Sequence, residues 1–164
     1  MRNTLITIFG TTLVPCILHI LVPYVILQGT SGLDFPHMGI VEILCIFIAI
    51  IGLYMVVWVS VTFVRRGRGT AVPLLPPTKF VAIGLYKYVR NPMYVGLLLV
   101  IIAEAIFFRS IWLFVFASLL WLATHTYVVL KEEPELARRF GDAYKEYLTQ
   151  TPRWIPRPPR KMGA

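Results

Sequence analysis

The sequence predicts an all-α integral membrane protein with about four transmembrane helices, a cytoplasmic loop and a C-terminal amphipathic helix. Two observations lead to this fold class. Of the 164 residues, 57% are hydrophobic and only 15% are charged, whereas soluble domains average about 45–50% apolar and about 25% charged residues. The apolar residues are also gathered in four long runs, as membrane-spanning helices require. This composition excludes a disordered chain, a disulfide scaffold and an ordinary soluble enzyme.

The first two runs predict the first two spans. The first covers roughly residues 4–27 and contains Pro15 and Pro23. It is too long for the core of a signal peptide, and no small-residue cleavage site follows it. The second covers residues 39–63 and carries one charge, Glu42, near its start. At about 1.5 Å per residue it can cross a hydrocarbon core about 30 Å thick.

The third and fourth runs predict a tight antiparallel helical hairpin. They cover residues 92–108 and 111–130, so only Arg109 and Ser110 separate them. Glu104 lies inside the third run, and a carboxylate within a span is a functional candidate by default. The alternative is that Glu104 simply lies near the outer interface, because the span ends four residues later.

The placement of basic residues predicts the orientation. The connection between the first two spans holds Asp34 as its single charge. Residues 64–92 hold no acidic residue and six basic ones: Arg65, Arg66, Arg68, Lys79, Lys87 and Arg90. Basic loops stay in the cytoplasm. We therefore expect this loop and both termini to be cytoplasmic, in the inner membrane if the source is prokaryotic.

The C-terminal region predicts an amphipathic helix at the same face. Leu136, Phe140, Tyr144 and Tyr147 recur at intervals of four, four and three, which places them on one helix face. The proline-rich residues 151–159 cannot continue that helix. We interpret residues 1–164 as a single membrane domain, with two N-terminal spans in residues 1–63 and the functional core in residues 64–164.

Residues 84–96 form the segment richest in polar and aromatic groups, directly before the third span. Asn91 is expected as the N-cap of that helix and Pro92 as its first residue. A helix N-terminus beside Arg90 can hold a carboxylate or a phosphate. The alternative is a capped helix flanked by tyrosine and arginine anchors at the membrane interface.

The adjacent carboxylates of Glu132 and Glu133 follow the fourth span. Because they repel each other, they suit a site that offers cations or hydroxyl donors. The alternative is that they favour the N-terminus of the tail helix through its dipole. No spacing of cysteine and histidine resembles a metal site, and the basic loop has few aromatic residues for stacking on nucleic acid. We therefore expect neither a metal nor a nucleic-acid partner.

Three ordered motifs carry a resemblance to a known family. They read Gly84-x-Tyr86-x-x-x-Arg90-Asn91-Pro92-x-Tyr94-x-Gly96, then Glu132-Glu133-x-x-Leu136-x-x-x-Phe140-Gly141-x-x-Tyr144-x-x-Tyr147, then Thr151-Pro152-Arg153. With these motifs, roughly residues 78–157 resemble the isoprenylcysteine carboxyl methyltransferase family. That family belongs with the integral membrane methyltransferases, which include phospholipid N-methyltransferases.

The resemblance implies an S-adenosylmethionine-dependent methyltransferase that acts on a lipid-like acceptor at the cytoplasmic face. It implies that Glu132 accepts hydrogen bonds from the cofactor. Arg90 and Glu133 are expected to position the acceptor, and Glu133 is the nearest base if the acceptor needs one. The residues implied to line the cofactor pocket are Val81, Tyr86, Asn91, Pro92, Met93 and Tyr94.

Two departures from the family pattern and two alternative functions remain. The family often has histidine where Asn91 stands, and eukaryotic members have a substrate-binding arginine where this chain has Val128. A prenylated-protein carboxylate is therefore not the expected substrate. One alternative is an NADPH-dependent enzyme of the sterol-reductase type, and the other is a small four-span transporter that uses Glu104. Transport sites usually lie near the middle of the membrane, whereas the polar residues here gather at one surface.

Overall fold

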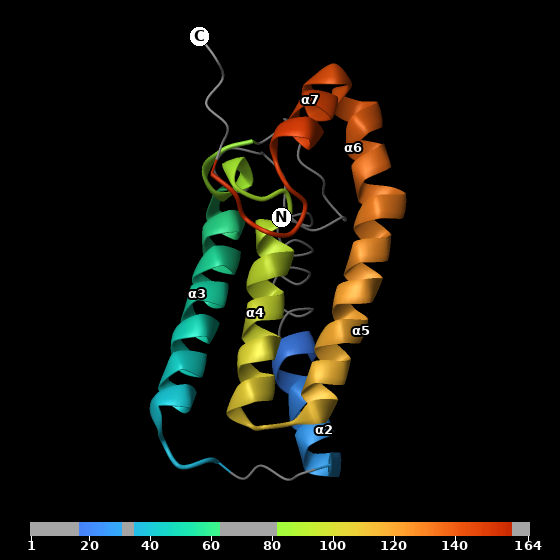
Figure 1. Cartoon of the computed structure of the whole chain (residues 1–164). Coiled ribbons are helices and arrows are strands. Elements are labelled where there is room, and N and C mark those ends of the chain that lie inside the picture. Colours follow the sequence, from blue (N-terminus) through green and yellow to red (C-terminus); the bar gives the residue numbers. More distant parts are fainter. Residues whose placement is uncertain (1–16, 31–34, 63–81, 159–164) are drawn as a thin grey trace, which may run out of the picture.

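A computed structural model describes residues 17–30, 35–62 and 82–158 of the chain. Within these ranges the secondary structure consists of helices and contains no strand (Figure 1). In chain order the elements are the π-helical turn η1 (Ile17–Leu21), α2 (Val22–Thr30), α3 (Ile40–Thr62), the 3₁₀ turn η3 (Gly84–Lys87), α4 (Pro92–Phe107), α5 (Ile111–Tyr127), the π-helical turn η4 (Val128–Glu132), α6 (Glu133–Phe140) and α7 (Asp142–Gln150).

Two of these helices are long and apolar enough to cross a membrane. They are α3, with 23 residues, and the continuous helix Ile111–Phe140, with 30 residues. Two other apolar helices are shorter, Ile17–Thr30 and Pro92–Phe107. The 16 residues of α4 extend only about 24 Å, less than the roughly 30 Å of a typical hydrocarbon core. The prediction of an all-helical fold is confirmed. That four of the helices span the membrane stays a prediction.

The predicted boundaries agree with two of the helices. The second predicted span corresponds to α3 and the third to α4. The start of the first predicted span, residues 4–16, lies outside the described residues. The fourth helix does not end near Leu130 as expected, because it continues through η4 and α6 to Phe140. The turn η4 ends two residues before Pro134, which cannot donate the usual hydrogen bond of a helix.

The helices α3 and α4 pack with their backbones in direct contact, side by side in Figure 1. A Cβ atom added to Gly52 would lie 2.5 Å from the backbone oxygen of Gly96. A Cβ atom added to Gly96 would lie 2.7 Å from the backbone oxygen of Gly52. Glycines at such a crossing let membrane helices approach closely. This contact fixes the position of α4, whose first residues form part of the site described below.

The predicted hairpin of α4 and α5 is present. The N–H of Phe108 donates to the carbonyl oxygen of Glu104 over 2.9 Å, and Arg109 takes a positive φ of 51° at the turn. Ser110 is the N-cap of α5, and its side chain accepts a bond of 3.4 Å from the N–H of Leu113. The hairpin directs the C-terminal half of α5 back toward the end of the molecule where α4 begins (Figure 1).

An ion pair joins the start of α3 to this turn. Arg109 Nη2 lies 2.9 Å from Glu42 Oε1, and the N–H of Gly39 donates to Glu42 Oε2 over 3.0 Å. The Glu42 side chain is 4% exposed, whereas that of Arg109 is 75% exposed. Glu42, the one charge in the second predicted span, therefore has two partners at the end of α3 far from α6 and α7 (Figure 1).

The prediction of one amphipathic helix through Tyr147 is wrong. The helix stops at Phe140, and α7 starts after Gly141, which has φ 58° and ψ −133°. Glycine alone tolerates this backbone conformation readily. The chain turns there, and α7 buries Tyr144 and Tyr147 against the rest of the protein. The four residues that were expected on one face are consequently divided between two helices.

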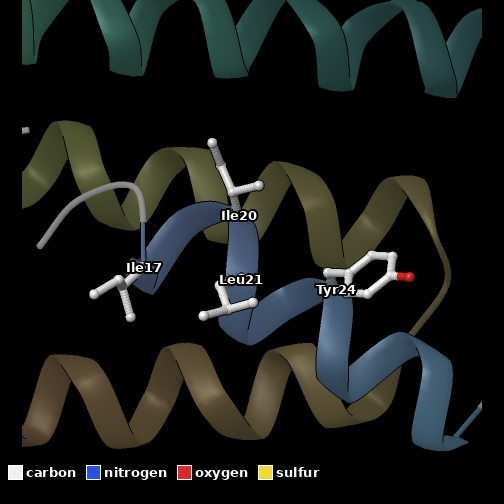
Figure 2. Close-up of a pocket in the computed structure, with 4 residues that line it drawn as sticks. All are labelled: Ile17, Ile20, Leu21 and Tyr24. Atoms are coloured by element: carbon white, nitrogen blue, oxygen red, sulfur yellow. The ribbon is translucent and has the colours of Figure 1, made fainter. Parts of the chain in front are cut away.

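An apolar hollow follows one face of η1 and α2, which contact α4 and α5 (Figure 2). Its lining residues are all exposed apolar or aromatic side chains: Ile17, Ile20, Leu21 and Tyr24. Many large apolar side chains of α3 and α5 are exposed as well. Such surfaces are typical of helices that are surrounded by hydrocarbon rather than water.

Candidate functional site

The loop before α4 lies against the indole of Trp58 in α3. Gly84 has a φ of +57°, and a Cβ atom there would clash with the ring of Trp58. Only glycine fits both the backbone conformation and the space. On the other side, the hydroxyl of Tyr147 donates to the carbonyl oxygen of Tyr86 over 2.8 Å. The loop is thus held between α3 and α7.

Asn91 stands at the N-cap position of α4, but it does not cap the helix. The predicted position is confirmed, but the side chain does not make the capping hydrogen bond expected of an N-cap asparagine. The residue is 7% exposed, and its Nδ2 donates instead to the carbonyl oxygen of Arg153 over 3.1 Å. Pro92 is the first residue of α4, as expected. Among the described residues, the side chain of Asn91 therefore leaves the first-turn N–H groups of α4 without a cap at its positive end.

Residues 151–157, which we call the C-terminal strap, run along this loop. The N–H of Arg90 donates to the carbonyl oxygen of Pro152 over 2.8 Å. The N–H of Arg157 donates to the carbonyl oxygen of Tyr88 over 3.0 Å. The strap follows α7 and returns across the start of α4 (Figure 1). The sequence indicated only that its prolines end a helix.

Glu133 is held by two arginines from opposite sides. Its Oε1 accepts from Arg90 Nη1 and from Arg153 Nε, each over 2.8 Å, and its Oε2 accepts from Arg153 Nη2 over 2.8 Å. The side chains of Arg90 and Glu133 are 12% and 13% exposed. The hydrogen bond to Glu133 raises the pKa of Arg153 above its usual value. Charge-assisted, two-pronged bonds of this kind are among the strongest in proteins, so they fix the loop, the strap and α6 relative to one another.

Glu132 has a different partner. Its Oε2 accepts a hydrogen bond of 3.2 Å from the hydroxyl of Tyr94, which joins the start of α4 to η4. Both carboxylates lie within the continuous helix Ile111–Phe140. No helix begins at these two residues, so the two carboxylates do not stabilise a helix N-terminus through its dipole. The interpretation that the pair suits cations and hydroxyl donors fits both sets of contacts.

One buried donor at this site has no acceptor. Arg90 Nε is fully buried and takes no hydrogen-bond partner among the described residues. A guanidinium N–H that is removed from water costs free energy unless it finds an acceptor. Arg90 directly precedes Asn91 and the uncapped start of α4. The site can consequently receive an anionic group at this point.

Three tyrosines around the site remain protonated. Burial raises the pKa of Tyr86, Tyr144 and Tyr147 well above the usual value for tyrosine. Their hydroxyl groups therefore act as neutral donors and acceptors rather than as anions. Tyr147 uses its donor to hold the loop, as described above.

The structure brings most of the predicted site residues together. Arg90, Asn91 and Glu133 share one hydrogen-bonded group with the strap. Tyr94 and Glu132 form a second hydrogen-bonded pair, which the chain joins to the first through the neighbouring Glu133. Pro92 and Met93 begin α4 beside it, and Tyr86 lies in the loop. Val81 lies outside the described residues, as does most of the predicted basic loop. Glu104 is ten residues beyond Tyr94 in α4, about 15 Å along the helix, so it lies away from the group.

Sequence reasoning missed the contributions of Arg153 and Trp58. Arg153 was part of a motif but had no assigned role, although its charge and position after the amphipathic region were visible. Trp58 lay in an apolar run that showed no sign of a contact with the loop. Its partner Gly84 supplies the only signal, since a glycine before a helix indicates either a turn or a close approach.

A comparison with protein families supplies an independent finding. A family model described as phospholipid methyltransferase matches residues 40–143. The match extends from the first residue of α3 into α7, so it includes Arg90, Tyr94 and both carboxylates. No curated protein matches the chain.

Proposed function

The chain belongs to the phospholipid methyltransferase family, and from this premise we propose that it transfers a methyl group from S-adenosylmethionine to a lipid-like acceptor at the cytoplasmic face of a membrane. The resemblance to the isoprenylcysteine carboxyl methyltransferases is confirmed, because the matched family is part of that larger group. The family match and the two long apolar helices indicate a membrane methyltransferase with a lipid-like substrate. The cofactor, the acceptor group and the orientation are our proposal.

The observation that carries the proposal is the pairing of an uncapped helix start with a partly buried carboxylate. S-adenosylmethionine presents a carboxylate, an ammonium group and ribose hydroxyls. The unpaired Nε–H of Arg90 and the first N–H groups of α4 suit the carboxylate. Glu132, with one bond from Tyr94, has free lone pairs for the ammonium or a hydroxyl. The residues present therefore fit the cofactor.

The remaining pocket residues follow from the same arrangement. We assign Tyr86, Pro92 and Met93 to its lining because they lie in the loop and at the start of α4. Val81 stays in the proposal from the resemblance alone. Asn91 contributes by holding the strap through the carbonyl oxygen of Arg153, which keeps its side chain away from the helix start.

When bound, the cofactor supplies a methyl group on a sulfonium, which is already a strong methyl donor. The protein has to orient the acceptor and exclude water. Orientation can lower the barrier by about 7–11 kcal/mol. The Arg90–Glu133–Arg153 bonds keep the walls of the site in one geometry, and the strap covers it. We propose that Arg90 and Glu133, held in this way, position the acceptor.

Proton transfer depends on the acceptor group. An ionised carboxylate needs no base, whereas a hydroxyl or an ammonium group must lose a proton. Both oxygens of Glu133 already accept hydrogen bonds from arginines, so this carboxylate is engaged in holding the loop and the strap. Within the described part of the chain, Glu132 accepts one hydrogen bond, from the hydroxyl of Tyr94. We therefore assign proton acceptance, where it is required, to Glu132 rather than Glu133.

Calorimetry of the purified full-length chain in detergent tests the proposal. We expect S-adenosylhomocysteine to bind with 1:1 stoichiometry and NADPH to give no heat of binding. Binding of NADPH without S-adenosylhomocysteine would replace the methyltransferase proposal with the reductase alternative. The measurement needs no knowledge of the acceptor.

A further inference from the structure

A second polar contact of the strap lies next to the carboxylate site. Trp154 Nε1 donates to His125 Nδ1 in α5 over 3.0 Å. The ring of Trp121 stacks on that of His125, with a centroid distance of 5.2 Å and an interplanar angle of 29°. Trp154 directly follows Arg153, whose side chain holds Glu133. We call Trp121, His125 and Trp154 the aromatic cluster.

The bond from Trp154 fixes the tautomer of His125. An indole N–H can only donate a hydrogen bond, so Nδ1 of His125 must be its acceptor and carry no proton. A neutral imidazole has one N–H, which must then be at Nε2. His125 Nε2 has no hydrogen-bond partner among the described residues. The cluster thus presents an oriented N–H donor without an acceptor.

The cluster lies at the boundary between the apolar helix and the charged site. His125 precedes Glu132 by seven residues in a continuous helix, which is about 10 Å along the axis. Trp121 is 41% exposed and its neighbour Leu122 is 54% exposed, so this stretch of α5 faces the hydrocarbon. Tryptophan and histidine at such a depth meet the headgroups and the first carbons of lipid chains.

We propose that His125 Nε2–H donates a hydrogen bond to a phosphate oxygen in the headgroup of a membrane lipid, and that Trp154 orients His125 for this contact. The inference rests on the proposed function and assigns part of the acceptor site. Phosphate oxygens are charged acceptors, which form stronger hydrogen bonds than ester carbonyls. Trp154 directly follows Arg153 in the strap, so the contact with His125 is tied to the ion pair of Arg153 and Glu133. His125 contacts the lipid, and Trp154 is a positioning residue.

Two substitutions separate lipid binding from strap binding. In His125→Asn the amide oxygen takes the place of Nδ1, so the variant keeps an acceptor for Trp154 and lacks the donor at Nε2. In His125→Gln the longer amide reaches the place of Nε2 and keeps a donor there. The proposal predicts that the asparagine variant loses lipid affinity and that the glutamine variant retains most of it.

The probes are dihexanoylphosphatidic acid and dihexanoylglycerol, which differ only by the phosphate, with inorganic phosphate as a third ligand. We expect His125→Asn to weaken binding of the phosphatidic acid by about 10- to 150-fold, the range for a lost hydrogen bond to a charged group. Affinity for dihexanoylglycerol should not change. If His125→Asn binds phosphatidic acid like the parent, His125 only holds the strap. If inorganic phosphate binds as tightly as the lipid, the site is one for free phosphate.

Nitrogen-15 NMR of histidine-labelled protein tests the orientation directly. The parent should show His125 as the Nε2–H tautomer, and Trp154→Phe should remove that preference. Trp112→Phe, at the other end of α5 and exposed, is the matched control. An unchanged tautomer in Trp154→Phe would overturn the positioning role. S-adenosylhomocysteine affinity is measured on every variant, so a failure of the proposed function appears in the parent and is distinct from a failure at His125.

Discussion

Glu132 and Glu133 have identical side chains, but their hydrogen-bond partners give them different roles. Glu133 binds two arginines with both of its oxygens. Glu132 receives one neutral hydroxyl. Both oxygens of Glu133 are occupied by arginines, so this carboxylate holds the site in shape. Glu132 can still accept further hydrogen bonds. Substitutions at the two positions should therefore have different effects.

Glu132→Ala should weaken the binding of S-adenosylhomocysteine by about 10- to 150-fold, because a hydrogen bond to a charged group contributes about 1.5–3 kcal/mol. Titration calorimetry of both proteins in the same detergent measures the change. Glu135→Ala is the control, since Glu135 lies on the same helix and pairs with Arg138 at the surface. Equal affinity of parent and Glu132→Ala would remove Glu132 from the pocket.

Asn91→Asp should lower both thermal stability and S-adenosylhomocysteine affinity. An ionised aspartate cannot donate to the carbonyl oxygen of Arg153, and an unsatisfied buried group costs about 1–3 kcal/mol. Asn91→His keeps a donor and should lose less of both. Thermal unfolding and calorimetry are recorded for the two variants in one detergent. If the aspartate variant matches the parent, the bond to the strap contributes nothing.

The fate of Asn91 also shows what a local pattern can and cannot predict. Asparagine followed by proline indicated the start of α4 correctly, because both preferences act within a few residues. The side chain instead bonds to residue 153, which is 62 positions away. No rule based on local spacing can predict a hydrogen-bond partner that lies so far away in the sequence. The motifs still identified Arg90, Tyr94 and both glutamates, since each stands beside the end of an apolar run.

At the scale of helices, the crossing of α3 and α4 depends on two glycines. Gly96→Ala should destabilise the protein, because the new Cβ atom would lie 2.7 Å from a backbone oxygen of α3. Overpacking of this kind typically costs about 1–3 kcal/mol. Gly29→Ala is the matched control, since a Cβ atom there meets nothing within 4 Å. Midpoints of thermal unfolding in detergent compare the two, and an equal effect would exclude the close approach as the cause.

The helices were predictable to different degrees. The ends of α3 and α4 follow from apolar runs, because hydrocarbon selects for long uninterrupted helices. The division between α6 and α7 did not follow, since Leu136, Phe140, Tyr144 and Tyr147 keep a helical spacing across the break. Gly141 was the available signal, and its positive φ is the physical reason for the break. The strap has no periodicity, so only its tertiary hydrogen bonds reveal its course.

For the whole molecule, the distribution of basic residues predicts which end faces the cytoplasm. Lys87→Cys and Lys145→Cys, both at the end that carries the site, should react with a membrane-impermeant thiol reagent from the cytoplasmic side only. Met38→Cys, two residues before the start of α3, should react from the opposite side. All three positions are exposed. The native Cys16 and Cys45 are replaced by serine first.

Reaction of Lys145→Cys from outside would reverse the orientation and remove the cytoplasmic site from the proposal. Reaction of Met38→Cys and Lys145→Cys from the same side would contradict the direction of the helix α3 through the membrane. The fold within the described residues would stand in either case, because it does not depend on which side is cytoplasmic.

The order of elements along the chain has a consequence for biosynthesis. The strap follows every apolar helix in the sequence, so during translation it emerges after those helices have entered the membrane. Until then the carbonyl groups that bind Arg90 and Asn91 do not exist, and Glu133 lacks its second arginine. Insertion and completion of the site are therefore separate events in time. A released chain that ends before Thr151 would keep the described apolar helices yet be unable to assemble the site.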